Sequence, residues 1–363
     1  MGHNLDHSEL DRRGILLSTE PEFHFISERR NGSDELAIFD SAKALKSNPV
    51  AQIVFGGNQF SALASAYQGN VTWPQLWLQG DVCVGNEISG VQSLFAENSV
   101  IRSIVQDGRV VGSYWEDEDA EYVLLAGILP AALGASRGAQ TSSVFERIES
   151  ALAEAGLDFS HVARTWLYLD RLLDWYDEFN LARTEFFEKH GVFAHLIPAS
   201  TGIGASNPFG AALTAGALAI RGKHDGVSVR EVVSPLQCEA TEYRSSFSRA
   251  VEINLPGRRY LTISGTASIA PEGQSLHRDD VVKQIHTTLD VVEAILKSHG
   301  YGWDHTVRAI GYFRNIEDLA VFDAISKERG IPPLPLAPAH AIVCRDDLLF
   351  EIELDAISFG EGE

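Results

Sequence analysis

Apolar and polar residues alternate strictly along residues 350–355, near the end of the chain. On a β-strand, the two sets would point to opposite faces: Phe350, Ile352 and Leu354 on one, Glu351, Glu353 and Asp355 on the other. The apolar face is typical of a strand that packs on helices. The other face carries three carboxylates, more than core packing explains, so it meets either water or a polar pocket. Residues 338–359 as a whole predict two strands joined by a tight polar turn at residues 345–347.

Two halves of the chain share one hydrophobic pattern. A strand ending in glycine (residues 122–127 and 260–265) precedes a helical stretch (142–162 and 279–306), a strand (163–170 and 307–315), a second helix (175–191 and 316–330) and terminal strands (198–220 and 338–359). Six residues of the first half recur 144 positions later: Leu152, Gly156, His161, Arg164, Tyr168 and Asp174 match Leu296, Gly300, His305, Arg308, Tyr312 and Asp318. This constant offset indicates an internal repeat.

The repeat predicts an α+β fold with two tandem units, each a mixed sheet with helices packed on one face. Apolar residues in the second copy's first helix give one buried stripe, at Val282, Ile285, Leu289, Val292 and Leu296. Short apolar runs in residues 51–115 predict a β-rich lead segment, and residues 1–40 are expected to begin irregularly. A polar linker at 222–226 separates a domain of residues 1–222 from one of residues 227–363.

Composition narrows the range of partners. The 363 residues carry a net charge of −21 without a basic patch, so we expect no nucleic acid partner. Three distant cysteines, Cys83, Cys238 and Cys344, indicate a reducing compartment and not a disulfide scaffold. The charged N-terminus is unlike a signal peptide, and no apolar run approaches a membrane span. We therefore expect a cytoplasmic protein without a membrane partner.

The repeated pattern GxxxxHxxRxxxYxxxxxD, with Pro-Ala opening the terminal strands, resembles the Rid superfamily, which has the L-PSP endoribonuclease-like, chorismate-mutase-like fold. The segments ARTWLYLDRLLDWYDEFNLARTEFF and PASTGIGASNPFGAAL resemble a narrower group, the chorismatases, which include the 3-hydroxybenzoate synthases. The resemblance covers roughly residues 75–360 and implies chorismate as the small-molecule substrate. Members split chorismate into pyruvate and either a cyclohexadiene diol or 3-hydroxybenzoate.

The resemblance implies a catalytic acid in the last strand. The family's glutamate lies seven residues after a cysteine in the members that form 3-hydroxybenzoate, and Glu351 follows Cys344 at that spacing. Cleaving the enolpyruvyl ether requires a protonated acid in a water-poor pocket. Repulsion from Glu353 and Asp355, assisted by burial, would raise the pKa of Glu351. The alternative is a solvated carboxylate on an exposed sheet face.

The corresponding strand of the first half, AALTAGALAI, holds no acid, so we expect one active site per chain. Strand alternation places several cationic and aromatic residues on the same side as Glu351, as candidates to bind the substrate: Arg164, Tyr168, Arg308, Tyr312 and Arg314. Arg183, in the second helix of the first half, is a further candidate. For any single arginine, a structural ion pair with one of the 50 acidic residues is the alternative.

Smaller residues complete the candidate site. In the family, the position of Cys344 separates the product classes, which favours 3-hydroxybenzoate and a role in proton relay or pocket shape; a buried apolar thiol is the alternative. Thr201 and Gly202 of PASTGIG would offer backbone N–H groups or form a tight turn, and Gly265, which ends the strand of residues 260–265, is a further substrate-binding candidate. The histidines lack metal-ligand spacing and the glycines lack a phosphate-binding context, so no metal or cofactor is expected.

Three other functions remain open on the sequence. The first is hydrolysis of chorismate to the diol. The second is the imine or enamine deamination of single-copy Rid proteins, but His340 and Ser200 stand where those proteins place an arginine after Pro-Ala. The third is a binding protein without catalysis. The tandem repeat could replace a subunit interface of the trimeric Rid proteins, so a monomer or a low homo-oligomer is expected.

Overall fold

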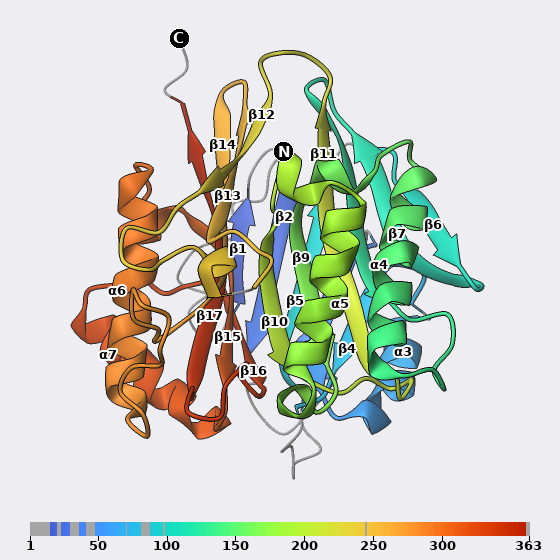
Figure 1. The fold of residues 1–363 in the computed structure, drawn as a ribbon. Helices are drawn as coiled ribbons and strands as arrows, with labels where there is room; N and C mark the ends of the chain where they lie inside the picture. The colour runs from blue at the N-terminus through green and yellow to red at the C-terminus, as the bar shows by residue number, and fades with distance from the viewer. Residues whose placement is uncertain are drawn as a thin grey trace.

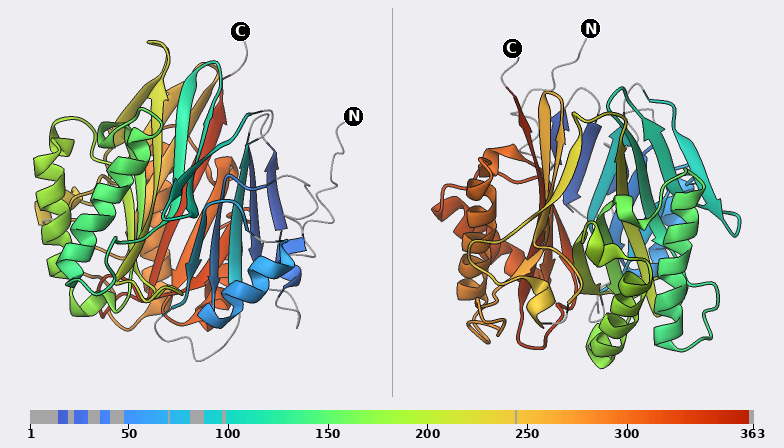
Figure 2. Two further views of the ribbon diagram at one scale, coloured as in Figure 1. Left: turned by 90° about the vertical axis from the view of Figure 1, so that its right-hand side faces the viewer. Right: turned by 45° about the horizontal axis from the view of Figure 1, so that its top comes forward.

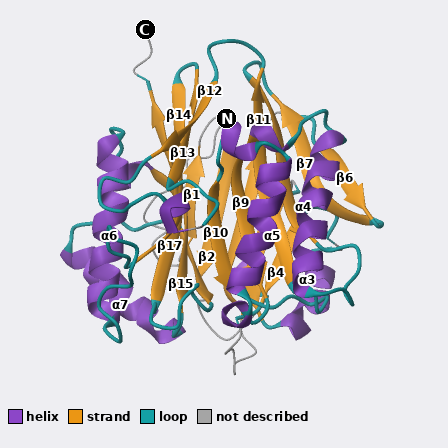
Figure 3. Ribbon diagram, in the orientation of Figure 1, coloured by secondary structure: helices purple, strands orange, loops and turns teal. Residues whose placement is uncertain are grey.

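Three β-sheets stand around a common core, with the helices on their outer sides (Figures 1 and 2). The structure is a computed structural model that describes residues 15–19, 23–29, 36–40, 48–69, 71–80, 88–96, 99–243 and 245–360. Figure 3 shows the layering: strands occupy the middle of the molecule and the long helices flank it on both sides. This arrangement confirms the α+β class and the mixed sheets expected from the sequence.

The first sheet has the strand order β1-β2-β5-β3-β4. Its elements are β1 (Ile15–Thr19), β2 (Phe23–Arg29), β3 (Ala51–Gly56), α3 (Ser61–Tyr67), β4 (Gln75–Leu78) and β5 (Ile88–Ala96). Strands β1 and β2 form an antiparallel pair that the sequence analysis did not predict; the irregular start expected for residues 1–40 falls on residues 1–14, which lie outside the described residues. Helix α3 was also missed, because its seven residues are too few to show a clear helical period.

The second and third sheets have the orders β10-β9-β11-β8-β7-β6 and β12-β13-β14-β17-β15-β16. The second contains β6 (Arg102–Gln106), β7 (Arg109–Glu116), β8 (Ala120–Ile128), α4 (Arg137–Ala153), β9 (Val162–Leu169), α5 (Tyr176–Lys189), β10 (Ala199–Gly204) and β11 (Leu213–Gly222). The third contains β12 (Ser228–Val232), β13 (Ala250–Leu255), β14 (Arg258–Ala267), α6 (Val281–Ser298), β15 (Thr306–Phe313), α7 (Leu319–Glu328), β16 (Leu336–His340) and β17 (Phe350–Phe359). Short 3-10 turns connect several of these elements.

The first sheet is a third copy of the repeated unit, which the sequence did not reveal. Every sheet contains one pair of parallel strands (β3–β4, β9–β10, β15–β16). The first strand of each pair is also bonded to an antiparallel strand, which is the last strand of its unit in chain order (β5, β11, β17). The registers make Phe55, Tyr168 and Tyr312 equivalent. Each is paired with a residue near the start of its unit's last strand, and these partners are Gly90, Thr214 and Glu351. The lead segment is therefore a reduced unit and not merely a β-rich extension.

The inner faces of the three sheets share one core. At its centre, the ring of Phe55 lies 6.4 Å from Tyr168 and 6.0 Å from Tyr312, measured between ring centroids, and the two tyrosine hydroxyls are hydrogen-bonded at 2.8 Å. Each outer face packs separately on its own helices, as Phe350, Ile352 and Leu354 do on α6 and α7. The alternation in residues 350–355 is thus confirmed, and the carboxylate face points inward.

Helices α4 and α6 are shorter at their C-termini than the sequence predicted. Gly156 and Gly300 follow these ends with φ of +73° and +77°, a left-handed conformation that glycine adopts without strain. The N–H groups of Leu157 and Tyr301 bond back to the carbonyls of Leu152 and Leu296, which caps each helix. The apolar stripe of α6 is confirmed except at Val282, which is exposed.

The two strands expected in residues 338–359 are present, as β16 and β17, but the tight turn expected to join them is wrong. Strand β16 ends at His340 and pairs in parallel with β15, while β17 pairs antiparallel with the other edge of β15. Residues 341–349 form a loop, in which Ile342 bridges to Gly204 of the second sheet. The loop therefore ties the third unit to the second and brings Cys344 to their junction. None of the described helices is long and apolar enough to cross a membrane.

Candidate active site

A cavity of about 280 Å³ lies between the second and third sheets, and Glu351 is in its wall. The second unit contributes the first turns of α5 and part of β10, and the third contributes the loop before β13, the end of β14, the loop after β16 and the start of β17. The lining residues are Tyr176, Asp177, Asn180, Arg183, Ser200, Gly202, Ser245, Phe247, Arg249, Gly265, Ala267, Ile269, Cys344, Arg345 and Glu351.

Glu351 has the environment of a neutral carboxylic acid. Only 5 % of the residue is exposed, although its side chain borders the cavity. Burial, and then the negative charge of Glu353, raise its pKa to about 8, against an opposing effect of Arg249. Burial is thus the larger cause of the raised pKa, and Glu353 is the second. The sequence analysis had named repulsion from Glu353 and Asp355 as the first cause. At neutral pH this group can donate a proton.

Gly265 makes room for the Glu351 carboxyl group. A Cβ atom built on Gly265 would overlap a Glu351 carboxyl oxygen, and it would come within 3.2 Å of the Thr201 methyl group. Gly265 therefore lines the cavity through its backbone, and its N–H donates to the Thr201 hydroxyl at 3.1 Å. This glycine permits close packing of β14 against β17 where the acid lies.

The equivalent positions in the other two sheets hold no acid. Glu351 pairs with Tyr312, as Thr214 pairs with Tyr168 and Gly90 with Phe55. The Thr214 hydroxyl donates to the Ile128 carbonyl at 3.1 Å. Gly90 of the first sheet has no side chain at this position. The three-unit geometry therefore concentrates this chemistry in the third sheet, in line with the expectation of one site per chain.

Cys344 lies in the same cavity and is a neutral thiol. Burial raises its pKa to about 12, with Glu351 as the next cause. A thiol that stays protonated is a poor nucleophile but can donate a hydrogen bond or fill space. The other described free cysteine, Cys238, is not among the cavity's lining residues; Cys83 lies outside the described residues.

Two buried arginines face the cavity from opposite units. Arg183 of α5 donates to Asn180 at 2.7 Å, and Arg249 donates twice to the Cys238 carbonyl, at 2.8 and 2.6 Å. The ring of Phe247 lies near both, 5.9 Å from the Arg183 guanidinium carbon and 5.6 Å from that of Arg249. Buried positive charge at a cavity wall is suited to an anionic ligand.

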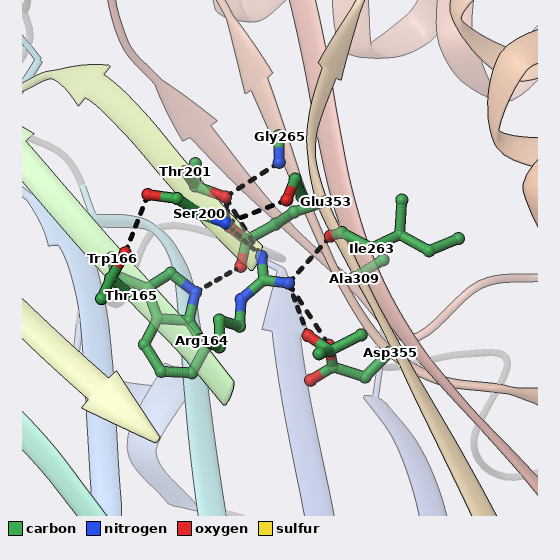
Figure 4. A network of polar contacts seen from close by, with 12 residues as sticks. Arg164, Thr165, Trp166, Ser200, Thr201, Ile263, Gly265, Ala309, Glu353 and Asp355 are labelled. Carbon is green, nitrogen blue, oxygen red and sulfur yellow. Dashed lines mark hydrogen bonds and ion pairs between the residues drawn. The ribbon is translucent and has the colours of Figure 1, made fainter. Parts of the chain in front are cut away.

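Arg164 and Arg308 belong instead to a buried network around Glu353; Figure 4 shows the Arg164 side of it. The Glu353 carboxylate forms an ion pair with Arg164 at 2.8 Å and another with Arg308, and it accepts hydrogen bonds from Trp166, at 2.8 Å, and from Thr201. Neither guanidinium lines the Glu351 cavity. The network joins the second unit to the third just behind that cavity.

The network fixes the charge of Glu353. Burial alone would raise its pKa, but Arg164 and Arg308, with the hydrogen bonds from Thr201 and Trp166, outweigh burial and hold it at about 2. Two carboxyl groups, two residues apart on one strand face, are therefore in opposite states at neutral pH. Glu351 keeps its proton and Glu353 is ionised.

The structure brings together five of the residues chosen from the sequence: Glu351, Cys344, Arg183, Gly202 and Gly265 all line the cavity. Thr201 lies in the adjacent network. Tyr168 and Tyr312 are at the central axis, and Arg314 bonds to the Asp346 carbonyl away from the cavity. These residues, like Arg164 and Arg308, are thus not in the cavity wall.

Sequence reasoning missed several lining residues. Tyr176 and Asn180 lie seven and three residues before Arg183 on one face of α5, so helical spacing from Arg183 could have identified them. Arg249 and Phe247 come from an irregular segment, where no periodic signal exists. The described residues contain no group of three or more His, Cys, Asp or Glu side chains placed to hold a metal ion.

Comparison with known proteins shows two families that the chain resembles. Residues 101–219 match the family model for chorismatase FkbO/Hyg5-like, N-terminal, and residues 239–358 match that for endoribonuclease L-PSP. A 3-hydroxybenzoate synthase of Streptomyces hygroscopicus is 26 % identical over 348 residues, which cover 87 % of this chain and 95 % of the relative. A chorismatase of the same organism is 27 % identical over 272 residues, 69 % of this chain and 75 % of the relative.

A solved structure supports the same assignment at the level of the fold. The crystal structure of a chorismatase superposes with a TM-score of 0.68 at 20 % identity, and the match covers 94 % of this chain and 99 % of the other. It therefore includes all three sheets. The two family models match in order along the chain, so this protein resembles the chorismatases in residues 101–219 and the endoribonuclease L-PSP family in residues 239–358.

Proposed function

We propose that this enzyme cleaves the enolpyruvyl ether of chorismate and releases pyruvate and 3-hydroxybenzoate, with Glu351 as the acid. The observation that carries the proposal is a buried, protonated glutamate in a cavity that also holds two buried arginines and a neutral thiol. The names of the relatives, chorismatase and 3-hydroxybenzoate synthase, support the proposed substrate and the proposed aromatic product.

The chemistry begins with proton transfer. Glu351 would protonate the terminal methylene of the enolpyruvyl group, which leaves an oxocarbenium-like carbon next to the ether oxygen. Attack by an oxygen atom on that carbon and cleavage of the ether bond then give pyruvate. If water attacks and the ring is unchanged, the second product is a diol. 3-Hydroxybenzoate requires the ring also to lose its other hydroxyl group and a ring proton.

Arg183 and Arg249 are the proposed ligands of the two substrate carboxylates. Their guanidinium groups are nearly completely buried, and Asn180 and the Cys238 carbonyl orient them. Arg345 is a third cation in the wall, held by the Gly273 carbonyl at 2.7 Å. We assign Arg164 and Arg308 a structural role, because Glu353 and Asp355 already neutralise them.

We expect Arg183→Met and Arg249→Met each to lower kcat/KM for chorismate by roughly 10- to 100-fold, since each removes a charge-assisted hydrogen bond. Arg314→Met is the control, because Arg314 lies outside the cavity wall, and it should change kcat/KM less than about 3-fold. Steady-state kinetics of the three variants measure this. An Arg314 effect as large as the other two would contradict the assignment of the arginines.

We expect Cys344→Ala to change the products more than the rate. The thiol is neutral and cannot act as a nucleophilic thiolate at neutral pH, so pyruvate release should fall less than about 10-fold. The ratio of 3-hydroxybenzoate to diol should shift toward the diol, since the wider pocket admits water. Liquid chromatography of both products measures the ratio, and Cys238→Ala is the matched control. An unchanged product ratio in the Cys344→Ala variant would show that Cys344 does not determine the product.

Incubation of the purified protein with chorismate tests the proposal directly, with pyruvate and the aromatic fraction assayed separately. Pyruvate with an equal amount of 3-hydroxybenzoate is the expected result. Pyruvate with the diol alone would retain chorismate cleavage and overturn the product. Without pyruvate, the proposed function fails, and deamination or binding without catalysis would be tested next.

A further inference from the structure

A second cavity lies at the centre of the molecule, where the three sheets meet. Its volume is about 110 Å³, and it shares no lining residue with the Glu351 cavity. All three units contribute: Ile53 and Leu94 from the first, Trp115 and Leu218 from the second, and Ile253 and Tyr260 from the third. Its walls are almost entirely apolar or aromatic, and none of its residues takes part in the proposed chemistry.

The strand registers explain why this space exists. Arg164, Arg308 and Ala51 are equivalent, because each lies four residues before the residue of its strand at the central axis. Asp355, Leu218 and Leu94 are equivalent on the last strands. The two arginines extend toward Glu353 and Asp355, whereas Ala51 has no long side chain to fill the corresponding volume. The cavity occupies the place of the missing third arginine.

One end of the cavity is polar. The Asp355 carboxylate lines it, accepts a hydrogen bond from Thr262 at 2.7 Å and forms an ion pair with Arg308 at 3.3 Å. Its side chain keeps 17 % exposure, whereas that of Arg308 keeps 5 %, so the Asp355 side chain is the more accessible of the two. A carboxylate oxygen accepts more than one hydrogen bond, so a donor on a ligand can add to the bonds that Asp355 already has.

We propose that this central cavity binds a small uncharged aromatic molecule of the phenol class, with its hydroxyl group donating to Asp355. The aromatic walls suit ring packing: Trp115 stacks on Tyr122 with centroids 5.3 Å apart, and the Trp166 ring also lines the cavity. At the polar end Arg308 and Asp355 neutralise each other, so an anion would find no unpaired cation there, and burying unpaired charge among apolar side chains is unfavourable. The volume of about 110 Å³ is below the roughly 150 Å³ of a cavity known to hold benzene in a protein, so it limits the ligand to a single ring.

The proposal goes beyond chorismate cleavage and does not depend on it. The three carboxylates of β17 mark three successive levels: Glu351 in the catalytic cavity, Glu353 in the ion-pair network and Asp355 at the central cavity. Figure 4 shows Asp355 on the opposite side of Arg164 from Thr201 and Gly265. Binding at the third level can therefore be measured without the substrate.

The probe for the test is 4-bromophenol. In crystals of the full chain soaked with it, the anomalous signal of bromine should appear among Trp115, Leu94 and Leu218. In solution, it should quench tryptophan fluorescence with saturation, and half-saturation is expected on the order of 1 mM. The anion 4-bromobenzoate should bind at least about 10-fold more weakly.

Two cavity-filling variants and one control sharpen the test. Ala51→Leu and Leu218→Phe should weaken 4-bromophenol binding at least about 10-fold, whereas the same change at an exposed site, Ala62→Leu on α3, should not. Non-saturable quenching, unchanged affinity in both folded filling variants, or tighter binding of 4-bromobenzoate would overturn the proposal. If the filling variants do not fold, the bromine position in the unaltered protein decides: a signal only outside the central cavity overturns it.

Discussion

Replacing Glu351 with glutamine is expected to lower kcat for pyruvate release by roughly 10³-fold, within the range attributed to a general acid. Glutamine keeps the size and hydrogen-bonding shape of the protonated side chain but has no proton to give to the enol methylene. Because the substitution is nearly isosteric with the neutral acid, KM should change little. Stopped or continuous pyruvate assays measure both constants. A variant that keeps full activity would exclude Glu351 as the acid.

The pH dependence provides a second test of the same residue. The pKa of Glu351 is raised to about 8, so the acid form predominates below that value, and kcat/KM should fall as pH rises through it. Stability follows the same sign: the raised pKa contributes stability that is fully present below the unfolded value near 4.5 and is lost as pH rises through 8. Glu351→Gln should therefore unfold less readily than the unaltered protein above pH 8. A variant less stable at high pH would contradict this assignment.

Strand periodicity predicted the inner and outer faces correctly. Alternation alone put Glu351 on the face opposite Phe350 and Ile352, and put Arg164 and Arg308 on the inner face of their strands, because successive side chains must point in opposite directions. It could not show which groups meet across the junction of two sheets. The arginines proved to face Glu353, and that pairing depends on how the second and third sheets pack together, which is a long-range property.

The Glu351 cavity was only partly predictable for the same reason. The family resemblance pointed to Glu351 and Cys344, which have the family's spacing, and to Arg183 in a matching segment, whereas Arg249 and Phe247 reach the cavity from an irregular loop. The first unit escaped detection because its equivalents of the repeated residues have changed: Ala51 stands for arginine and Phe55 for tyrosine. Only the strand register reveals such a copy, and register is fixed by sheet pairing and not by local sequence.

Because the three sheets belong to one chain, equivalent positions can hold a different residue in each sheet. Identical subunits must hold the same residue at every such position. The position of Glu353 is Gly216 in the second unit and Gln92 in the first. Gln92 donates to the Ala309 carbonyl at 3.3 Å and thus joins the first unit to the third without a charge. The full ion-pair network forms only between the second and third units. The charged junction and the Glu351 cavity therefore coincide at one of the three interfaces.

Glu353 is expected to matter mainly for folding, because four partners from two units converge on its buried carboxylate. Arg164, Trp166 and Thr201 come from the second unit, and Arg308 lies beside Glu353 in the third. Removing one partner of a buried ion pair leaves the opposite charge uncompensated, which costs more than the pair itself contributes. Here the loss would leave two guanidinium groups with Asp355 as their nearest acid.

Glu353→Gln should therefore lower the free energy of unfolding at pH 7 by about 3–5 kcal/mol, measured by urea denaturation. The pKa of Glu353 is held near 2, so its contribution is present above the unfolded value near 4.5 and is lost as pH falls through 2. The destabilisation should consequently shrink as the unaltered protein and the variant are compared at decreasing pH. Glu351→Gln, two residues away on the same face, is the matched control, and it should not destabilise at pH 7 because the carboxyl group it replaces is already neutral. Equal losses in the two variants would show that burial, and not the charge of Glu353, holds this interface together.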